Sequence, residues 1–190
     1  GRPVAVRTPL SSAHLQLADK IHIDDYRGML IADRLGIGPK VHGKFVDSEG
    51  TVSLVMDIVP GDFVGEGQRV TLQTIRDLRE MRRRLQDAGL DIKGSFQALV
   101  TSMGRALLID QDESISTAGL GYTSDEEYAR TLEDVFLALN PADRSKALDE
   151  ISQAGDTRLI NALTHAQAVQ SPPETGGSST PGGSSTSGSS

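Results

Sequence analysis

The stretch LDIKGSFQALVTSMGRALLIDQD, residues 90 to 112, decides how the fold of this chain is interpreted. Its first seven residues predict a loop, and the apolar runs QALVT and RALLI around SMG predict a β-hairpin. The second run ends in Asp110, and Asp112 follows two positions later. An apolar strand belongs inside a sheet, and a carboxylate at its tip lies at the end of that sheet, where ligand and metal sites are commonly built. The alternative interpretation is an acidic turn without a ligand.

A long amphipathic helix is predicted upstream of this stretch, over residues 72–88, with Thr71 as its N-cap and Gly89 at its end. Its apolar residues share one stripe at helical spacing: Leu72, Ile75, Leu78, Met81 and Leu85. Its basic residues share another: Arg76, Arg79, Arg82, Arg83 and Arg84. We interpret the basic stripe as a solvated face, with Arg76 paired to Glu80, rather than as a docking patch.

The N-terminal part alternates strand and helix signals. PVAVR (3–7) favours a strand, and the second half of 13–35 has helical spacing that ends at Gly36. GIGPK reads as a loop, and VHGKFVD and TVSLVMDIV flank SEG, which predicts a β-hairpin. PGDFVGEGQ (60–68) is then a Gly-rich connection to the long helix.

The C-terminal part is helical up to a low-complexity tail. Three helices are predicted between residues 124 and 169, with Ser124, Asn140 and Asp156 as their caps. The last twenty residues, 171–190, consist of Ser, Gly, Thr and Pro with a single charge at Glu174. Such a segment buries too little apolar surface to offset its ordering entropy, so we expect a disordered tail or linker.

Composition excludes several classes of function. The net charge of −7 argues against a general nucleic-acid binder, because phosphate contacts need clustered Lys and Arg. The absence of cysteine excludes disulfides, thiolate metal sites and a Cys nucleophile, and the four His residues lack metal-ligand spacing. No run approaches the roughly 20 apolar residues of a membrane helix. We therefore expect neither nucleic acid nor membrane insertion.

The order of strand, helix, hairpin, helix, hairpin and helices resembles that of the protein-kinase-like superfamily. Four stretches carry the resemblance: PVAVR, LGIGPKV (35–41), LVMDIVPGDF (54–63) and residues 90–112. It implies an α+β, protein-kinase-like fold with a truncated, mostly helical C-terminal lobe. Residues 1–60 would form a small-lobe-like β/α portion, residues 61–170 a helical lobe with a catalytic-type hairpin, and residues 171–190 the tail.

The resemblance also implies a nucleotide site that binds ATP and Mg²⁺. Arg7 stands where the family has its phosphate-binding Lys, Met56 would line the back of the adenine pocket, and the backbones of Asp57 and Val59 would bond the base. A strand-edge ion pair with Asp24 or Asp25 is an equal alternative for Arg7.

The catalytic loop and metal turn come next in the resemblance. Asp91 and Lys93 are similar to the pair that orients or deprotonates the acceptor hydroxyl and neutralises the transferring phosphoryl group. Gln97 and Asp110 are thirteen positions apart, as are the two Mg²⁺ ligands of kinases.

The short region after Asp110 is similar to that of minimal kinase-like effectors that bacteria inject through type III secretion. This implies an effector, secreted into a host cell, that phosphorylates a host protein. The alternatives are a catalytically inactive pseudokinase or scaffold that binds a partner protein, and a small-molecule phosphotransferase of the aminoglycoside type. The sequence leaves the target, the acceptor residue and the oligomeric state open.

Overall fold

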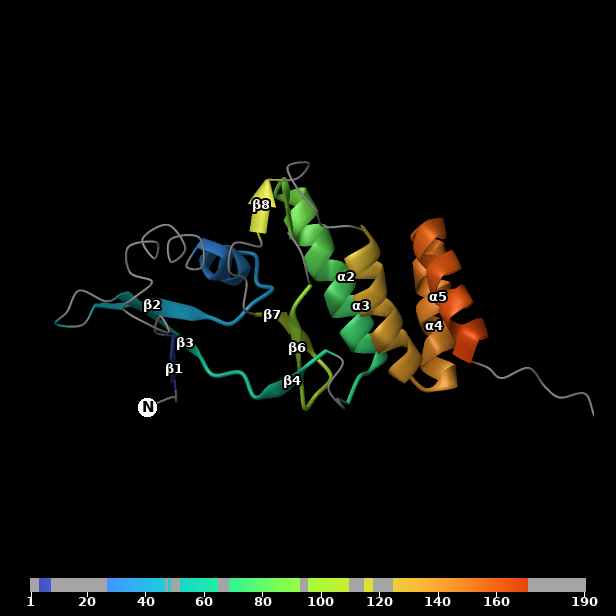
Figure 1. The fold of residues 1–190 in the computed structure, drawn as a ribbon, viewed down its shortest axis with the longest axis horizontal. Coiled ribbons are helices and arrows are strands. Elements are labelled where there is room, and N and C mark those ends of the chain that lie inside the picture. The colour runs from blue at the N-terminus through green and yellow to red at the C-terminus, as the bar shows by residue number, and fades with distance from the viewer. Residues whose placement is uncertain are drawn as a thin grey trace, which may run out of the picture.

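The computed structural model describes residues 4–7, 27–46, 48, 52–64, 69–92, 96–109, 115–117 and 125–170 (Figure 1). A three-stranded sheet lies at one end of the molecule and the helices α4 and α5 at the other, with a second small sheet and the helices α2 and α3 between them. The chain is therefore an α+β protein, as predicted, with antiparallel strand pairing throughout the described residues.

The first sheet has the strand order β1-β3-β2, formed by β1 (Val4–Arg7), β2 (Val41–Val46) and β3 (Val52–Asp57). The predicted β2–β3 hairpin is confirmed, with Phe45 opposite Ser53 in the register. A helix over residues 27–34 precedes β2, and the chain leaves it at Gly36 with φ +65°. Met29 of this helix packs against Leu54 and Met56 of β3 to form a small core.

The second sheet has the order β4-β6-β7, formed by β4 (Gly61–Phe63), β6 (Ala98–Thr101) and β7 (Ala106–Leu108). The predicted hairpin of QALVT and RALLI is confirmed in β6 and β7. The expectation of an irregular connection from residue 60 is wrong for 61–63, because this segment gains an edge position beside β6.

The loop expected for LDIKGSF is also wrong at its start. Residues Leu90–Ile92 form β5, which pairs with β8 (Ile115–Thr117) in a two-stranded sheet. A strand of three residues is too short to show the alternation that identifies a strand in a sequence. Its pairing partner lies more than twenty residues away, so the local pattern did not reveal it.

Helix α2 (Leu72–Asp87) is the central element of the larger core. Its predicted apolar stripe is confirmed, since Leu72, Ile75, Leu78, Met81 and Leu85 are all buried. Thr71 is the N-cap, and its backbone N–H donates to the hydroxyl of Thr74 at 3.0 Å. That hydroxyl in turn donates to the carbonyl of Gly104 at 2.6 Å, which ties the start of α2 to the turn between β6 and β7.

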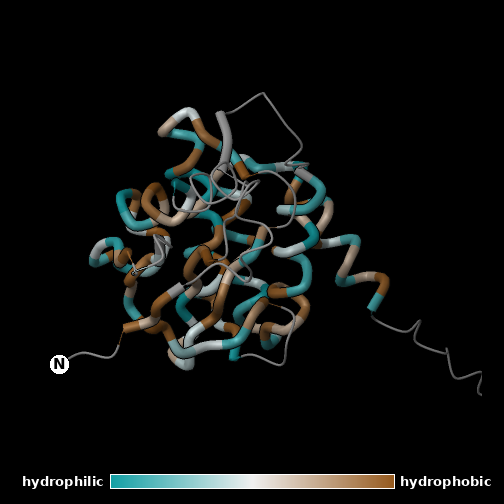
Figure 2. Tube along the Cα trace, turned by 60° about the vertical axis from the view of Figure 1, so that its left-hand side comes forward, coloured by the Kyte–Doolittle hydropathy of each residue, from teal (hydrophilic) through white to brown (hydrophobic). Residues whose placement is uncertain are grey.

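Three helices complete the fold: α3 (Asp125–Ala138), α4 (Pro141–Gln153) and α5 (Thr157–Gln170). The caps predicted at Asn140 and Asp156 are confirmed, because their side chains accept the backbone N–H groups of Asp143 at 2.9 Å and Leu159 at 3.1 Å. Hydrophobic and hydrophilic residues alternate along the helical tubes in Figure 2, as expected for helices with one buried stripe. Within the described ranges, no helix has the length and apolar character needed to cross a bilayer.

Candidate functional site

One hydrogen bond joins the segment that leads into the first sheet to the β6–β7 hairpin, and residues of both parts belong to the predicted nucleotide site. The backbone N–H of Leu108 on β7 donates to the carbonyl of Ile37 at 2.7 Å, directly after the helix at 27–34. Gly38 fits closely beside this bond, since an added Cβ would lie 2.7 Å from the Cβ of Ala32 and 3.1 Å from the carbonyl oxygen of Leu108. The close packing fixes β7 against the element that leads into β2.

The hinge-like segment begins with the last residues of β3 and continues beyond it. Met56 is 8% exposed and belongs to the small core with Met29 and Leu54. The backbone N–H of Asp57 donates to the carbonyl of Lys40 at 2.9 Å, and its carboxylate pairs with Nε2 of His42 at 2.6 Å. The contact with His42 was not expected from the sequence. Val59 lies beyond the paired residues of β3 and is half-buried.

A cavity of about 320 Å³ adjoins the end of this segment. Its lining comes from both sides of the β4–β6 pairing and consists of Pro60, Gly61, Asp62, Arg69, Val100, Thr101 and Ser102. The cavity is therefore next to the hinge-like residues, on the side of β4.

Gln97 stands immediately before β6, and its backbone carbonyl accepts the N–H of Ile109 at 3.3 Å. This bond extends the β6–β7 pairing by one step beyond Ala98 and Leu108. Residues 97 and 109 thus lie side by side. Asp110, the next residue along the chain, lies outside the described residues, as does Asp112.

Asp91 lies within β5 and is turned toward α2. One carboxylate oxygen accepts the N–H of Ile92 at 2.9 Å, and the other lies 4.0 Å from Nη2 of Arg82. Lys93, its predicted companion, lies outside the described residues. The structure therefore places Asp91 beside a cation that the sequence did not assign to it.

Arg7 is the last residue of β1, and its backbone pairs with Leu54 of β3. The structure describes its backbone position and not its side chain. Asp24 and Asp25, its alternative partners, lie outside the described residues, as do the turn at 49–51 and the predicted tail at 171–190.

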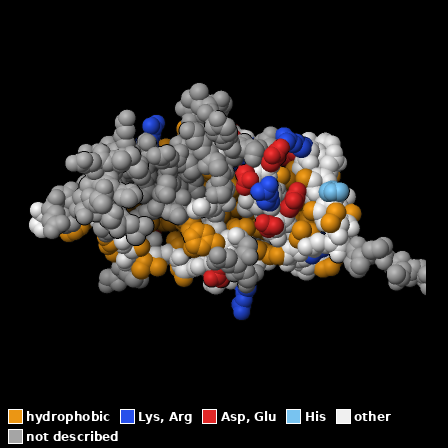
Figure 3. All heavy atoms as spheres, in the orientation of Figure 1, with side chains coloured by type: hydrophobic (Ala, Val, Ile, Leu, Met, Phe, Trp, Pro, Cys, Tyr) orange, Lys and Arg blue, Asp and Glu red, His pale blue; other side chains and the backbone are white. Residues whose placement is uncertain are grey.

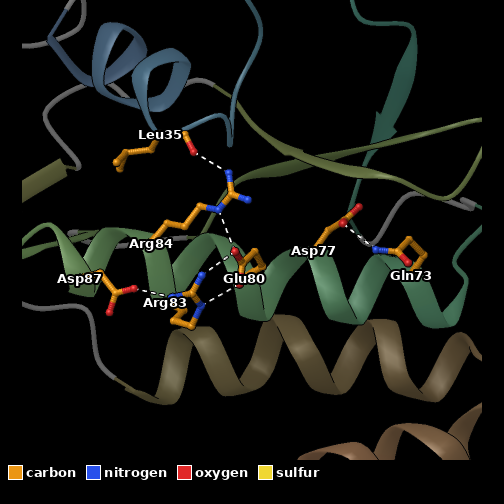
Figure 4. A network of polar contacts seen from close by, with 7 residues as sticks. All are labelled: Leu35, Gln73, Asp77, Glu80, Arg83, Arg84 and Asp87. Carbon is orange, nitrogen blue, oxygen red and sulfur yellow. Dashed lines mark hydrogen bonds and ion pairs between the residues drawn. The ribbon is translucent and has the colours of Figure 1, made fainter.

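The basic stripe of α2 differs from its predicted form. Arg76 pairs with Glu150 of α4 instead of Glu80, with Nε 2.9 Å from the carboxylate. Glu80 accepts from Arg83 at 2.7 Å and from Arg84 at 2.8 Å (Figure 4), and these two bonds lower its pKa to about 2. Arg83 and Arg84 lie within about one helical turn of Glu80, so they compete with Arg76 for its carboxylate.

Arg82 is the second departure from a solvated stripe. Its side chain is 14% exposed, and its guanidinium lies 4.4 Å from the ring centroid of Tyr128 on α3. Tyr128 also meets Phe96 edge to face, with ring centroids 5.6 Å apart. Burial raises the pKa of the Tyr128 hydroxyl above its usual range. Arg82 thus packs in the interface of α2, α3 and β5, and its guanidinium is largely shielded from solvent.

The chemistry of the predicted ligands suits Mg²⁺ with a nucleotide, because the ion takes oxygen ligands from few protein groups and keeps waters and phosphate oxygens. Gln97 can supply an amide oxygen, and the Gln97–Ile109 bond brings that residue to the end of the strand that leads to Asp110. No group of three or more acidic or His side chains among the described residues is placed to hold a metal on its own. An amide oxygen and a carboxylate are ligand types that Mg²⁺ takes beside phosphate oxygens, and binding of Mg²⁺ by Gln97 and Asp110 stays a prediction.

No protein-family model matches the chain, and no curated protein matches it significantly in sequence. Among solved structures, the chain is similar to a crystal structure of WbdD, with 16% identity and a TM-score of 0.49. The match covers 88% of this chain and 42% of the WbdD chain, so the chain spans less than half of that protein's length.

The resemblance to the protein-kinase-like superfamily through its minimal type III effectors is therefore wrong as a family assignment. Several weak motifs in the expected order suggested it, yet neither a family model nor a curated protein matches. Short motifs match unrelated proteins often, which is why order and spacing alone misled the assignment. Secretion into a host cell and a host protein target followed from that resemblance alone, and they stay predictions.

Proposed function

We propose that this chain binds ATP with Mg²⁺ at the junction of the first sheet and the β6–β7 hairpin, in a kinase-like fold with a truncated, mostly helical C-terminal lobe. The strand order β1-β3-β2, the connection from Asp57 to β4 and the central helix α2 support the fold part of the proposal. In this arrangement the hinge-like segment and the β6–β7 hairpin are joined through β4, which pairs with β6.

The hydrogen bond from the N–H of Ile109 to the carbonyl of Gln97 carries the proposal. It puts the backbone of Gln97 opposite Ile109, the residue that precedes Asp110 in the sequence. Gln97 and Asp110 are thirteen positions apart in the sequence, as are the two Mg²⁺ ligands of kinases, and this spacing supports their use as a pair. Gln97 and Asp110 would hold the metal, and the metal would neutralise charge on the phosphates.

The remaining residues have roles that follow from their positions. The buried side chain of Met56 would close the back of the base pocket, and the backbones of Asp57 and Val59 would bond the base. Arg7 and Lys93 would neutralise phosphate charge, with Arg7 offering a planar fork instead of a point charge. Asp91 would orient the acceptor hydroxyl, which we take to belong to a protein partner.

One observation favours the alternative, a catalytically inactive nucleotide-binding or partner-binding scaffold. Asp91 is engaged by its own backbone neighbour Ile92 and lies 4.0 Å from Arg82. A carboxylate held between these groups is a weaker hydrogen-bond acceptor for a substrate hydroxyl than a free one. Binding of Mg-ATP without phosphoryl transfer is the signature of this alternative.

Calorimetric titration with ATP, in the presence and absence of Mg²⁺, tests the proposal. Metal and nucleotide should bind cooperatively, and Asp110→Ala should remove a coupling of roughly 1–3 kcal/mol. Asp112→Ala is the matched control, because it removes a carboxylate two positions away and should leave the coupling intact. If neither ATP nor Mg-ATP binds at millimolar concentration, the nucleotide proposal fails. If Mg-ATP binds but labelled phosphate reaches no protein acceptor, the scaffold alternative holds.

A further inference from the structure

A groove crosses the helical part of the molecule, on the side of α2 that faces α3 and the turn between α4 and α5. Two adjoining hollows form it, with volumes of about 550 and 480 Å³. They share three lining residues, Arg82, Tyr128 and Asp156, so they are continuous. Together they offer space for several side chains of an extended peptide.

The α2 end of the groove is basic in a protein whose net charge is −7. Four arginines line it: Arg76, Arg79, Arg82 and Arg83. The acids in the same hollow are Glu80 and Asp156, and both are already used inside the protein. Glu80 accepts from Arg83 and Arg84, while Asp156 caps α5 through the N–H of Leu159. Arg76 pairs with Glu150, Arg83 pairs with Glu80 and Asp87, and Arg82 lies 4.0 Å from Asp91. Among the described residues, the arginine of this lining that is left without an ion pair is therefore Arg79.

Arg79 is the residue best placed to meet a ligand. It lies between Arg76 and Arg83 on one face of α2, half-buried, and it lines the basic hollow. Within the part of the chain that the structure describes, Arg79 makes no hydrogen bond or ion pair, whereas Arg76 is paired with Glu150 and Arg83 with Glu80 and Asp87. An arginine fork without a carboxylate partner among the described residues suits a bidentate bond to an incoming carboxylate.

The other end of the groove has a mixed lining from α3 and α5. Arg130 and Arg158 lie there with Glu126 and Glu133, beside the apolar surfaces of Ala129, Leu159 and Ala162. Acidic and basic side chains lie next to one another over the helical part of the molecule in Figure 3. The groove thus changes along its length from basic at α2 to mixed and partly apolar at α5.

We propose that this groove is a docking site for an acidic peptide segment of a partner protein, with Arg79 binding a carboxylate and the α5 end taking less charged residues. Charge complementarity commits the proposal to an acidic segment, because arginines outnumber carboxylates in the lining of the α2 end, and Arg79 has no carboxylate partner among the described residues. The two connected hollows favour an extended peptide over a single small anion. The inference stands apart from the nucleotide site, since none of the groove residues is assigned to it.

Fluorescence anisotropy with a labelled oligoglutamate tests the proposal on the full chain. We expect binding that weakens as salt rises, and Arg79→Gln should weaken it roughly tenfold, the loss of one charged bidentate contact. Arg34→Gln is the matched control, because Arg34 is exposed on the helix at 27–34 and away from the groove, and it should bind as the wild type does. Arg79→Lys keeps the charge but lacks the planar fork, so its affinity for oligoglutamate should lie between those of Arg79→Gln and wild type.

Three results would overturn the proposal. One is equal binding of Arg79→Gln and wild type, and another is equal binding of an oligoglutamine of the same length. The third is saturation by inorganic phosphate with no binding of oligoglutamate, which would assign the groove to a small anion. Thermal melting of each variant, followed by far-UV circular dichroism, separates a loss of binding from a loss of fold. If Arg79→Gln melts at a lower temperature than wild type, the affinity of Arg79→Lys tests the proposal in its place, and equal binding of Arg79→Lys and wild type would then overturn it.

Discussion

Nη1 of Arg84 on α2 donates a hydrogen bond to the backbone carbonyl of Leu35, 2.8 Å away (Figure 4). Leu35 follows the helix at 27–34, so this bond connects the element that supports the first sheet to the central helix of the larger core. Nε of the same guanidinium donates to Glu80 at 2.8 Å, which holds the side chain in place. Arg84 is thus a link between the two parts of the fold that surround the proposed nucleotide site.

We predict that Arg84→Met lowers the free energy of unfolding by about 1–2 kcal/mol, because it leaves the carbonyl of Leu35 without this charged donor. Arg83→Met is the control, since the partners of Arg83 among the described residues are Glu80 and Asp87, on the exposed side of the same helix. The control should change stability by no more than about 0.5 kcal/mol. Urea unfolding of both variants measures the difference, and equal effects would argue against a linking role for Arg84.

Leu78→Ala should cost about 2–5 kcal/mol of unfolding free energy. Leu78 is fully buried at the middle of α2, where its side chain belongs to the larger core. Val169→Ala, at a position on α5 that is 72% exposed, should have almost no effect. A loss below about 1 kcal/mol for Leu78→Ala in urea unfolding would contradict the central position of α2.

Gly38→Ala should destabilise the contact between the 35–40 loop and β7 by about 1–3 kcal/mol, because the new methyl group would overlap Ala32 and crowd the carbonyl of Leu108. Hydrogen exchange of the Leu108 amide is a local reporter, since it donates to Ile37. The double variant Gly38→Ala with Ala32→Gly removes the overlapping methyl group. The double variant should lose less unfolding free energy than the sum of the losses of the two single variants. Strict additivity would show that residues 38 and 32 do not contact each other.

Stability should fall as the pH drops from about 4.5 to about 2, partly through Glu80. The hydrogen bonds of Arg83 and Arg84 lower the pKa of Glu80 from 4.5 to about 2 in the folded protein. A depressed carboxyl pKa contributes stability that is present above the unfolded pKa and lost as the pH falls through the folded one. Glu80 is partly exposed, so its share should be below roughly 1 kcal/mol.

The measurement is the free energy of unfolding against pH for wild type and Glu80→Gln. The variant should show a shallower decline over this acidic window than the wild type. Parallel curves for wild type and Glu80→Gln would mean that Glu80 has the same pKa in the folded and unfolded states. Glu150, whose pKa Arg76 lowers, would then be the next residue to test.

The local elements of this protein were predictable because their signals lie within a few residues. The stripe from Leu72 to Leu85 repeats at helical spacing, the caps at Asn140 and Asp156 bond residues three positions on, and the β2–β3 hairpin pairs segments that adjoin in sequence. Each feature satisfies backbone groups or buries one face without help from distant parts of the chain.

The sequence by itself also suggested a site around Gln97 and Asp110, but it misjudged the surroundings of Asp91 and of the arginines on α2. Tertiary packing pairs β5 with β8, gives Arg76 a partner 74 residues away at Glu150, and brings Arg82 against Tyr128 and Asp91. A long, flexible Arg side chain has many acceptors within reach, and the competition among them is settled only when the helices pack. Helix α2 and the caps at Asn140 and Asp156 were therefore determined by the sequence alone, whereas the charge pairing around α2, and with it the groove, was decided by the tertiary structure.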